Sequence, residues 1–165
     1  MATLKQNIQK AVREMLKRYT DCPDEHIIAG YNNHVQLPED NDYIIFTVLN
    51  PVRYGTPRVV TDINGNTSYQ HFRLEVQIDF YGNFAFDRAS DIINISRTEF
   101  LCEFFKPYGI QPIACDDAQN LTGVSGEQEY VERWMARLEF DYQDAVSDSQ
   151  DWFNTAELNI FETEL

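Results

Sequence analysis

The 165-residue sequence predicts an α+β fold in a single domain, residues 1–165, with a mostly antiparallel sheet of about five strands and two helices packed on one face. Three observations lead to this prediction. Apolar residues recur at three- and four-residue steps in two segments, and they alternate with polar residues in others. A hairpin signal also precedes the longest alternating segment. Such a sheet buries one face under the helices and leaves the other face polar.

Two segments have the apolar spacing of helices. In residues 3–19 the spacing is set by six side chains, Leu4, Ile8, Val12, Met15, Leu16 and Tyr19. Thr3 can cap this helix, because its hydroxyl can accept a bond from a free backbone N–H group. The second helix is predicted for residues 84–105. It follows Asn83, which can cap it, and stops before Pro107, which cannot continue a helix.

The clearest strand is predicted at Thr67–Tyr81, where apolar and polar residues alternate throughout the second half. A β-branched and aromatic segment predicts another strand at Tyr43–Leu49. The dipeptide Asn64-Gly65 predicts a hairpin turn before the long strand. Pro57 lacks a backbone donor and therefore indicates a break or an edge position in the connecting segment.

Further strands are predicted in the second half of the chain. They comprise a short strand at Ile110–Cys115, an aromatic strand at Val131–Tyr142 and a final strand over Ala156–Ile160. Residues 143–165 follow no recognisable pattern as a whole. We interpret them as an added edge strand or an arm that reaches a neighbouring molecule.

Composition and charge exclude several classes of protein. No apolar run approaches the about 20 residues that a membrane helix needs, and the start of the chain lacks a secretory pattern. We therefore expect synthesis in the cytoplasm, with reduced cysteines at positions 22, 102 and 115. The formal net charge is −14, and residues 107–165 hold 13 acidic and two basic residues, or −11 of it. That half should repel nucleic acid.

No motif of enzymatic chemistry is complete in this sequence. Residues 123–126 resemble a nucleophile elbow, but Glu127 stands where that motif requires glycine. Cys22, His26 and His34 do not have the spacing of a structural zinc site. Phosphate-binding glycine motifs are also absent. We therefore expect no catalytic, cofactor-binding or metal-binding residues.

The string from Leu74 to Ile92, LEVQIDFYGNFAFDRASDI, resembles a segment of phage neck or tail terminator proteins. In that family a V-Q-V-D-x-Y-G strand end leads into an alanine-containing helix. The order of predicted elements over Thr3–Tyr142 resembles the family as well. It comprises an N-terminal helix, a proline-flanked strand, the segment 77–82, a helix and a late aromatic strand.

The resemblance implies a bacteriophage virion assembly protein without catalytic activity. Such a protein would form a ring, expected to be a hexamer, that caps the tail tube and joins it to the head connector. The implied partners are further copies of the chain, the tail tube protein and the head-tail connector protein, with no membrane involved. The implied location is the neck or tail of the virion, after synthesis in the bacterial host cytoplasm. DNA would pass through the ring without specific binding.

Two sets of residues are candidates for contacts in such a ring. Arg58 and Tyr69 flank the predicted turn, which should protrude from the sheet, and Arg73 and Asp79 lie on the polar face of the long strand. We interpret these four residues as a partner interface.

The second set would face the channel and repel DNA by its negative charge: Glu127, Glu129, Asp141 and Asp144. The alternative role for this acidic half is solubility.

Three alternatives to a terminator remain open at this point. A head-tail connector or adaptor of the neck would share the size, the acidity and the lack of catalytic residues. A small hydrolase could use Asp116 and Asp117 with a histidine from elsewhere in the fold. A host-encoded binding module or inhibitor would also have this composition.

Overall fold

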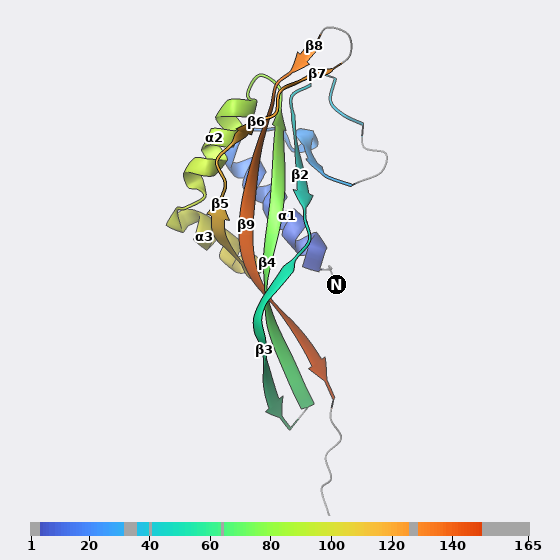
Figure 1. Ribbon diagram of the computed structural model, residues 1–165, viewed down its shortest axis with the longest axis vertical. Coiled ribbons are helices and arrows are strands. Elements are labelled where there is room, and N and C mark those ends of the chain that lie inside the picture. Colours follow the sequence, from blue (N-terminus) through green and yellow to red (C-terminus); the bar gives the residue numbers. More distant parts are fainter. Residues whose placement is uncertain (1–3, 32–35, 40, 64, 126–128, 150–165) are drawn as a thin grey trace, which may run out of the picture.

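The structure, a computed structural model, describes residues 4–31, 36–39, 41–63, 65–125 and 129–149. These residues form three α-helices, two short 3-10 helices and nine strands (Figure 1). In chain order the elements are α1 (Leu4–Tyr19), a 3-10 helix (Asp24–His26), β1 (Ile27–Ala29), β2 (Tyr43–Val48), β3 (Val52–Asp62), β4 (Gly65–Tyr81), α2 (Ala85–Ile95), α3 (Glu99–Phe105), a 3-10 helix (Lys106–Tyr108), β5 (Ile110–Cys115), β6 (Gln119–Asn120), β7 (Gly123–Ser125), β8 (Glu129–Val131) and β9 (Arg133–Asp148).

Seven of the strands form one mixed sheet. Its order is β1-β2-β4-β9-β5, with β3 beside the first half of β4 and β6 beside the start of β9. β1 and β2 are parallel, and the other pairs are antiparallel. β7 and β8 form a separate two-stranded ribbon. The α+β class is therefore confirmed, but the sheet has more strands than the five predicted.

The extra strands are those without an alternating apolar pattern. β1 and β6 are only three and two residues long, and β3 is exposed along almost its whole length. Such strands are stabilised by backbone hydrogen bonds to a longer neighbouring strand. This pairing leaves no alternation of apolar and polar residues from which it could be predicted. The strand predicted over Ala156–Ile160 lies outside the described residues.

The segment predicted as one helix, residues 84–105, is two helices, α2 and α3. The break lies at Ser96 and Thr98, whose hydroxyls donate 2.6 Å bonds to the carbonyls of Ile93 and Ile95. These side chains compete with the helical backbone for the same acceptors, so the first helix ends there. α2 begins after Phe84 without a side-chain cap, so the capping role predicted for the preceding asparagine is wrong.

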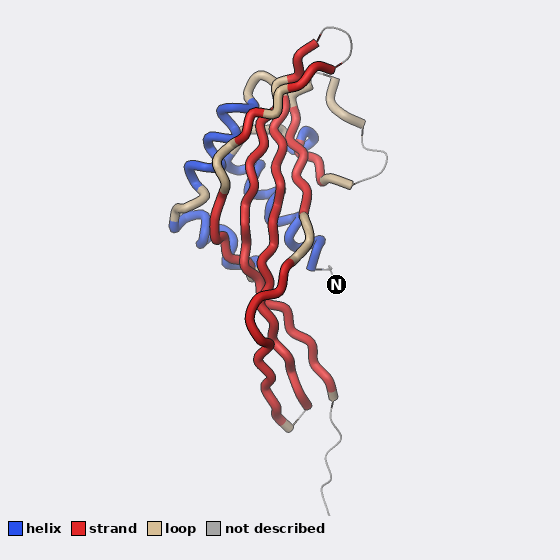
Figure 2. The backbone as a smooth tube through the Cα atoms, viewed as in Figure 1, coloured by secondary structure: helices blue, strands red, loops and turns tan. Residues whose placement is uncertain are grey.

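The core lies between the sheet and the three helices, which pack on one of its faces (Figure 2). Alternation in the second half of β4 predicts that Phe72, Leu74, Val76, Ile78 and Phe80 are buried; the last four are at most 2% exposed, which confirms the alternation there, and Phe72 is only partly buried. These four face the apolar side of α1, which buries five residues: Ile8, Ala11, Val12, Met15 and Leu16. Among the described helices, none combines the length and the apolar character required to cross a lipid bilayer.

Candidate functional site

The sheet extends beyond the helices as a three-stranded arm, at the lower end of Figure 1. We define the arm as β3 with Ile63 at the turn that follows it, residues 65–72 of β4 and residues 143–148 of β9. β4 is its central strand and pairs with β3 on one side and with β9 on the other, both antiparallel. No helix of the described chain lies beside the arm in Figure 2. The side chains on both of its faces are therefore open to solvent over most of its length.

Large apolar side chains of the arm are exposed. Ile63, beside the hairpin turn, is 86% exposed, and Val146 is 68% exposed. Val59 and Val146 both lie opposite Ser68, so they share one face of the arm at the same level. Val52 and Tyr54 are also exposed near its root. Apolar side chains gathered on a protruding element favour a contact surface for another protein.

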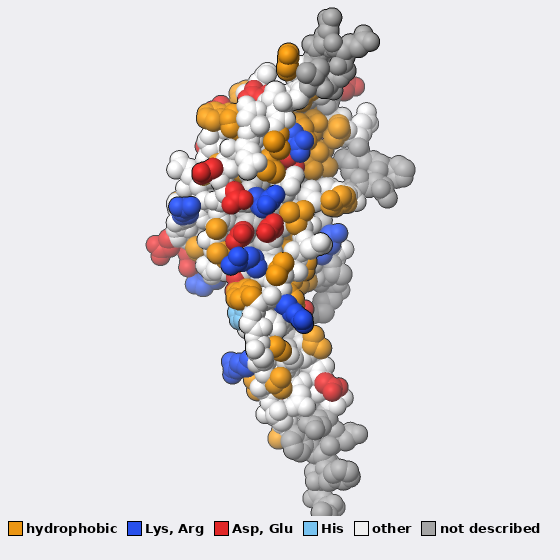
Figure 3. Space-filling view, in the orientation of Figure 1, with side chains coloured by type: hydrophobic (Ala, Val, Ile, Leu, Met, Phe, Trp, Pro, Cys, Tyr) orange, Lys and Arg blue, Asp and Glu red, His pale blue; other side chains and the backbone are white. Residues whose placement is uncertain are grey.

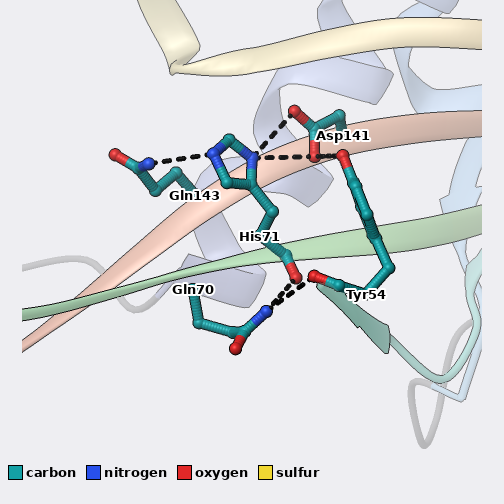
Figure 4. Close-up of polar contacts among 5 residues, drawn as sticks. All are labelled: Tyr54, Gln70, His71, Asp141 and Gln143. Atoms are coloured by element: carbon teal, nitrogen blue, oxygen red, sulfur yellow. Dashed lines mark hydrogen bonds and ion pairs between the residues drawn. The ribbon is translucent and has the colours of Figure 1, made fainter. Parts of the chain in front are cut away.

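A polar cluster joins the three strands at the root of the arm (Figure 4). The Tyr54 hydroxyl donates a 2.5 Å bond to Oδ1 of Asp141, and Nδ1 of His71 lies 3.2 Å from Oδ2 of the same carboxylate. The amide nitrogen of Gln143 lies 3.0 Å from Nε2 of His71. An amide nitrogen donates, so Nε2 accepts and Nδ1 carries the imidazole proton. Gln70 donates to the backbone carbonyl of Tyr54, which fixes β3 against β4.

The root cluster has an electrostatic consequence for its tyrosine. The hydrogen bond to Asp141 raises the pKa of Tyr54 above its ordinary value, because a phenolate would lie against a carboxylate. β3 becomes irregular directly after this residue, with a register shift between Tyr54 and Arg58. Gly55 takes a positive φ of 72° there, and Pro57 donates no backbone bond. The predicted edge position of Pro57 is confirmed, because β3 is an edge strand.

The face of the sheet opposite the helices carries a ladder of ion pairs between β4 and β9. In each of the three pairs, the charged residue of β4 contacts the β9 residue that lies two positions before its register partner. The twist of the sheet brings these diagonal neighbours close together. Positive and negative side chains alternate on this face in Figure 3. The pairs of Arg73 and Arg137 are partly exposed and contribute little stability, so we attribute to them the solubility of an uncovered face, whereas the pair of Arg133 satisfies the buried carboxylate of Asp79. The pairs are Arg73–Glu139 at 3.7 Å, Arg137–Glu75 at 3.8 Å and Arg133–Asp79 at 2.9 Å.

The residues predicted as a partner interface lie on two different surfaces. Arg58 and Tyr69 are register partners on the arm, next to the hairpin, which protrudes as predicted. Arg73 and Asp79 lie on the open face of β4. Asp79 is only 5% exposed and is bound by Arg133, so its carboxylate is already occupied. Contact of any of the four with a partner stays a prediction.

The residues predicted to face a channel do not form one cluster. Asp141 belongs to the root cluster and Asp144 to the arm. Glu129 lies in β8, at the opposite end of the molecule in Figure 1. Glu127 lies outside the described residues. Their role toward DNA stays a prediction.

Of the candidate metal ligands, Cys22 and His26 are described, and His34 lies outside the described residues. His26 contacts the backbone carbonyl of Asp42 at 2.7 Å through Nδ1. Cys22 and Cys115 are buried, and burial raises the pKa of the Cys115 thiol to about 11. Among the described residues, no three His, Cys, Asp or Glu side chains gather as metal ligands.

In the described part of the chain, no hydrogen bond joins the aspartates named for a hydrolase to a histidine. Asp116 and Asp117 are exposed, and the bonds described for His26 and His71 go to other groups. Ser125 ends the short strand β7.

The sequence indicated an added edge strand or an arm within residues 143–165, but not that it continues the strand predicted to end at Tyr142. Residues 143–148 extend β9 beyond the Tyr142 predicted as its end, and they pair with β4 down to Asn66. The length of the predicted strand Thr67–Tyr81 was the available signal. A strand that begins near Thr67 and lies in the centre of a sheet needs a partner on each side, and a strand that ends at Tyr142 is too short to pair with its first residues. The contact of Tyr54 and His71 with Asp141 joins positions far apart in the chain and had no signal.

The model of a family described as phage neck terminator protein matches residues 6–164. The match includes the arm, the ribbon formed by β7 and β8, and the body, by which we mean the helices and the part of the sheet that they cover. No curated protein matches the chain.

Proposed function

The chain belongs to the family of phage neck terminator proteins, and we propose that it acts without catalysis, as a ring that caps the tail tube and joins it to the head connector. Membership places the protein in assembly of the phage neck and tail. The ring, the capping of the tube and the contact with the connector are the parts that we propose.

The single observation that carries this proposal is the arm. We propose that the protein occupies the growing end of the tube with groups that reach past its helix-covered part. β3, β4 and β9 supply such a reach, with exposed apolar side chains at the tip and no helix of the described chain over them. Structural rings need rigid units with complementary surfaces, and the helix-covered body is such a unit.

The acidic side chains support a channel through which DNA passes without being held. Binding to phosphates requires clustered Lys and Arg residues, whereas residues 107–165 carry a net −11. We propose that Glu127, Glu129 and Asp141 face this channel; Asp144, on the arm, is left out of the test because it lies at a strand edge where copies can meet. Changing these three residues to lysine should slow DNA ejection from virions carrying the variant. Unchanged ejection by rings whose structure places the three outside the channel would exclude this role.

The test of capping uses purified tail tubes and electron microscopy. The variant replaces residues 62–67 with a minimal turn, which shortens the hairpin and removes Ile63 and its neighbours from the tip. We expect the variant to keep its circular dichroism spectrum and to leave tube ends open, while the parent protein caps them. The matched control is Asp116→Asn with Asp117→Asn, two exposed residues of the body, which should cap tubes normally.

Two outcomes would redirect the proposal. A parent protein that binds purified connectors and ignores tube ends would act as a neck adaptor. Loss of function in the Asp116→Asn and Asp117→Asn control, with normal folding and capping by the hairpin variant, would favour the hydrolase alternative.

A further inference from the structure

The arm has two outer edges that no strand of the described chain covers. One is the outer edge of β3, and the other is the outer edge of β9 over residues 143–148, beyond its pairing with β5. An uncovered strand edge presents a row of backbone N–H and C=O groups that can pair with another strand. The central strand, β4, is fully occupied by its two neighbours. Both edges are therefore able to accept a strand from outside.

The two edges carry opposite charges. β3 holds Arg53 and Arg58 with one acid, Asp62, at the end next to the turn, whereas the arm segment of β9 holds Asp144 and Asp148 and no base. The ion pairs found among the described residues involve neither the two arginines nor Asp144 and Asp148. In Figure 3 a basic side chain projects on the β3 side of the arm and an acidic one on the β9 side. The charges are thus available to a partner, and each edge complements the other edge.

We infer that copies of this chain join arm to arm, with β3 of one copy pairing with β9 of the next. The inference rests on the proposed ring and names the surface that closes it. Two β3 edges would bring arginines together, and two β9 edges would bring aspartates together, so only the head-to-tail arrangement is favoured. A head-to-tail contact is the kind that generates rings.

The direction and level of the pairing follow from the register. β3 and β9 each run antiparallel to β4, so they are parallel to each other. A cyclic ring keeps this direction and joins β3 and β9 of neighbouring copies as a parallel pair. Val59 and Val146 lie at one level within a copy, both opposite Ser68. Neighbouring copies without axial displacement bring these exposed valines together.

Charge reversal tests the pairing without touching the core. One variant carries Arg53→Asp and Arg58→Asp, and the other carries Asp144→Arg and Asp148→Arg. Each alone has two edges of like charge, so self-association in sedimentation velocity should weaken by about 100-fold or more. An equal mixture should associate again, because each variant then offers the edge that the other lacks. Parent-like association of either variant alone overturns the inference.

A disulfide test works both in free solution and on tube ends. Within one copy, Val59 and Val146 lie two strand spacings apart, about 9–10 Å, too far for a disulfide. In a Cys102→Ser background, which removes the partly buried native thiol, the Val59→Cys, Val146→Cys variant should therefore link only different copies, and ladders of linked chains should appear on a non-reducing gel. Val59→Cys alone in the same background should form no ladder; dimers from it would indicate β3–β3 pairing instead. Absence of ladders from the double variant both free and on tubes overturns the inference.

The two tests separate this inference from the proposed function. If the cysteine variant forms disulfide-linked chains while tube ends stay open, the pairing of arms is supported and the capping function is rejected. Capped tubes that show neither linkage nor any effect of charge reversal would keep capping and reject the pairing.

Discussion

β4 and β9 run through both the body and the arm, yet the two regions are stabilised in different ways. In the body, alternate residues of both strands are buried against helices; Phe140 of β9, for example, packs edge-on against Phe105 of α3 with ring centroids 4.9 Å apart. In the arm the same strands carry mostly polar or exposed residues, with Phe72 stacked on Tyr142 at the boundary, and pairing rests on the backbone and on the root cluster. Burial of side chains thus stabilises the body. The side chains of the arm are not needed for a core, so they can contact other molecules.

The largest expected effect comes from a cavity in the body. Phe140→Ala removes a fully buried ring and should lower the free energy of unfolding by about 3–5 kcal/mol. Val146→Ala, on the same strand but in the arm, should change it by about 0.5 kcal/mol or less. Urea unfolding followed by circular dichroism measures both. Equal losses from the two variants would mean that the arm has a core of its own.

An intermediate effect is expected at the ion pair that fixes α2 to the residue preceding β2. Arg88 is almost buried and binds both carboxylate oxygens of Asp42, at 2.7 and 3.0 Å. Arg88→Met should cost about 2 kcal/mol, less than a fully buried pair because the carboxylate keeps some contact with water. Arg73→Met, which opens a pair on the exposed face, should cost at most about 0.5 kcal/mol. A cost from Arg73→Met as large as that from Arg88→Met would contradict the distinction between covered and open faces.

The root cluster should make a small, pH-dependent contribution. The pKa of Tyr54 is raised by its bond to Asp141, so the folded protein keeps this proton at pH values where the unfolded chain has lost it. The stability from this bond is fully present below about pH 10 and is lost as the pH rises through the folded pKa. Tyr54→Phe should therefore reduce the loss of stability above pH 10. The parent and the variant are compared by urea unfolding between pH 8 and pH 11, and identical slopes would contradict the role of the bond.

The smallest effect concerns thiol reactivity in the body. Cys115 is buried and its pKa is raised to about 11, so little thiolate is present or accessible in the folded state. Cys102 is only partly buried. Iodoacetamide at pH 8 should therefore modify Cys102 before Cys115, as peptide mass spectrometry would show. Prior labelling of Cys115 would indicate that this part of the body opens.

The sequence predicted the body well because burial leaves a pattern. The alternation within β4, the spacing of apolar residues in α1 and the strand at Ile110–Cys115 all coincide with elements of the structure. The break between α2 and α3 was missed, because it depends on two hydroxyls that compete for local carbonyls.

The arm was predicted only in part. Its hairpin followed from Asn64-Gly65, but residues 143–148 have no burial and therefore no pattern. Their pairing is set by the length of β4, and the root cluster is set by the register of strands far apart in sequence. Interactions of this kind become visible only when the chain is folded.

The continuity of β4 and β9 also has a mechanical meaning. Their pairing extends without a register shift from Asn66 opposite Asp148 to Tyr81 opposite Arg133. The hydrogen bonds lie across the strands, so a pull along the arm strains many of them in parallel, whereas a peeling force strains them one at a time. The arm is thus a rigid continuation of the sheet of the body. A force applied at its tip is therefore carried by β4 and β9 into the part of the sheet on which α2 packs.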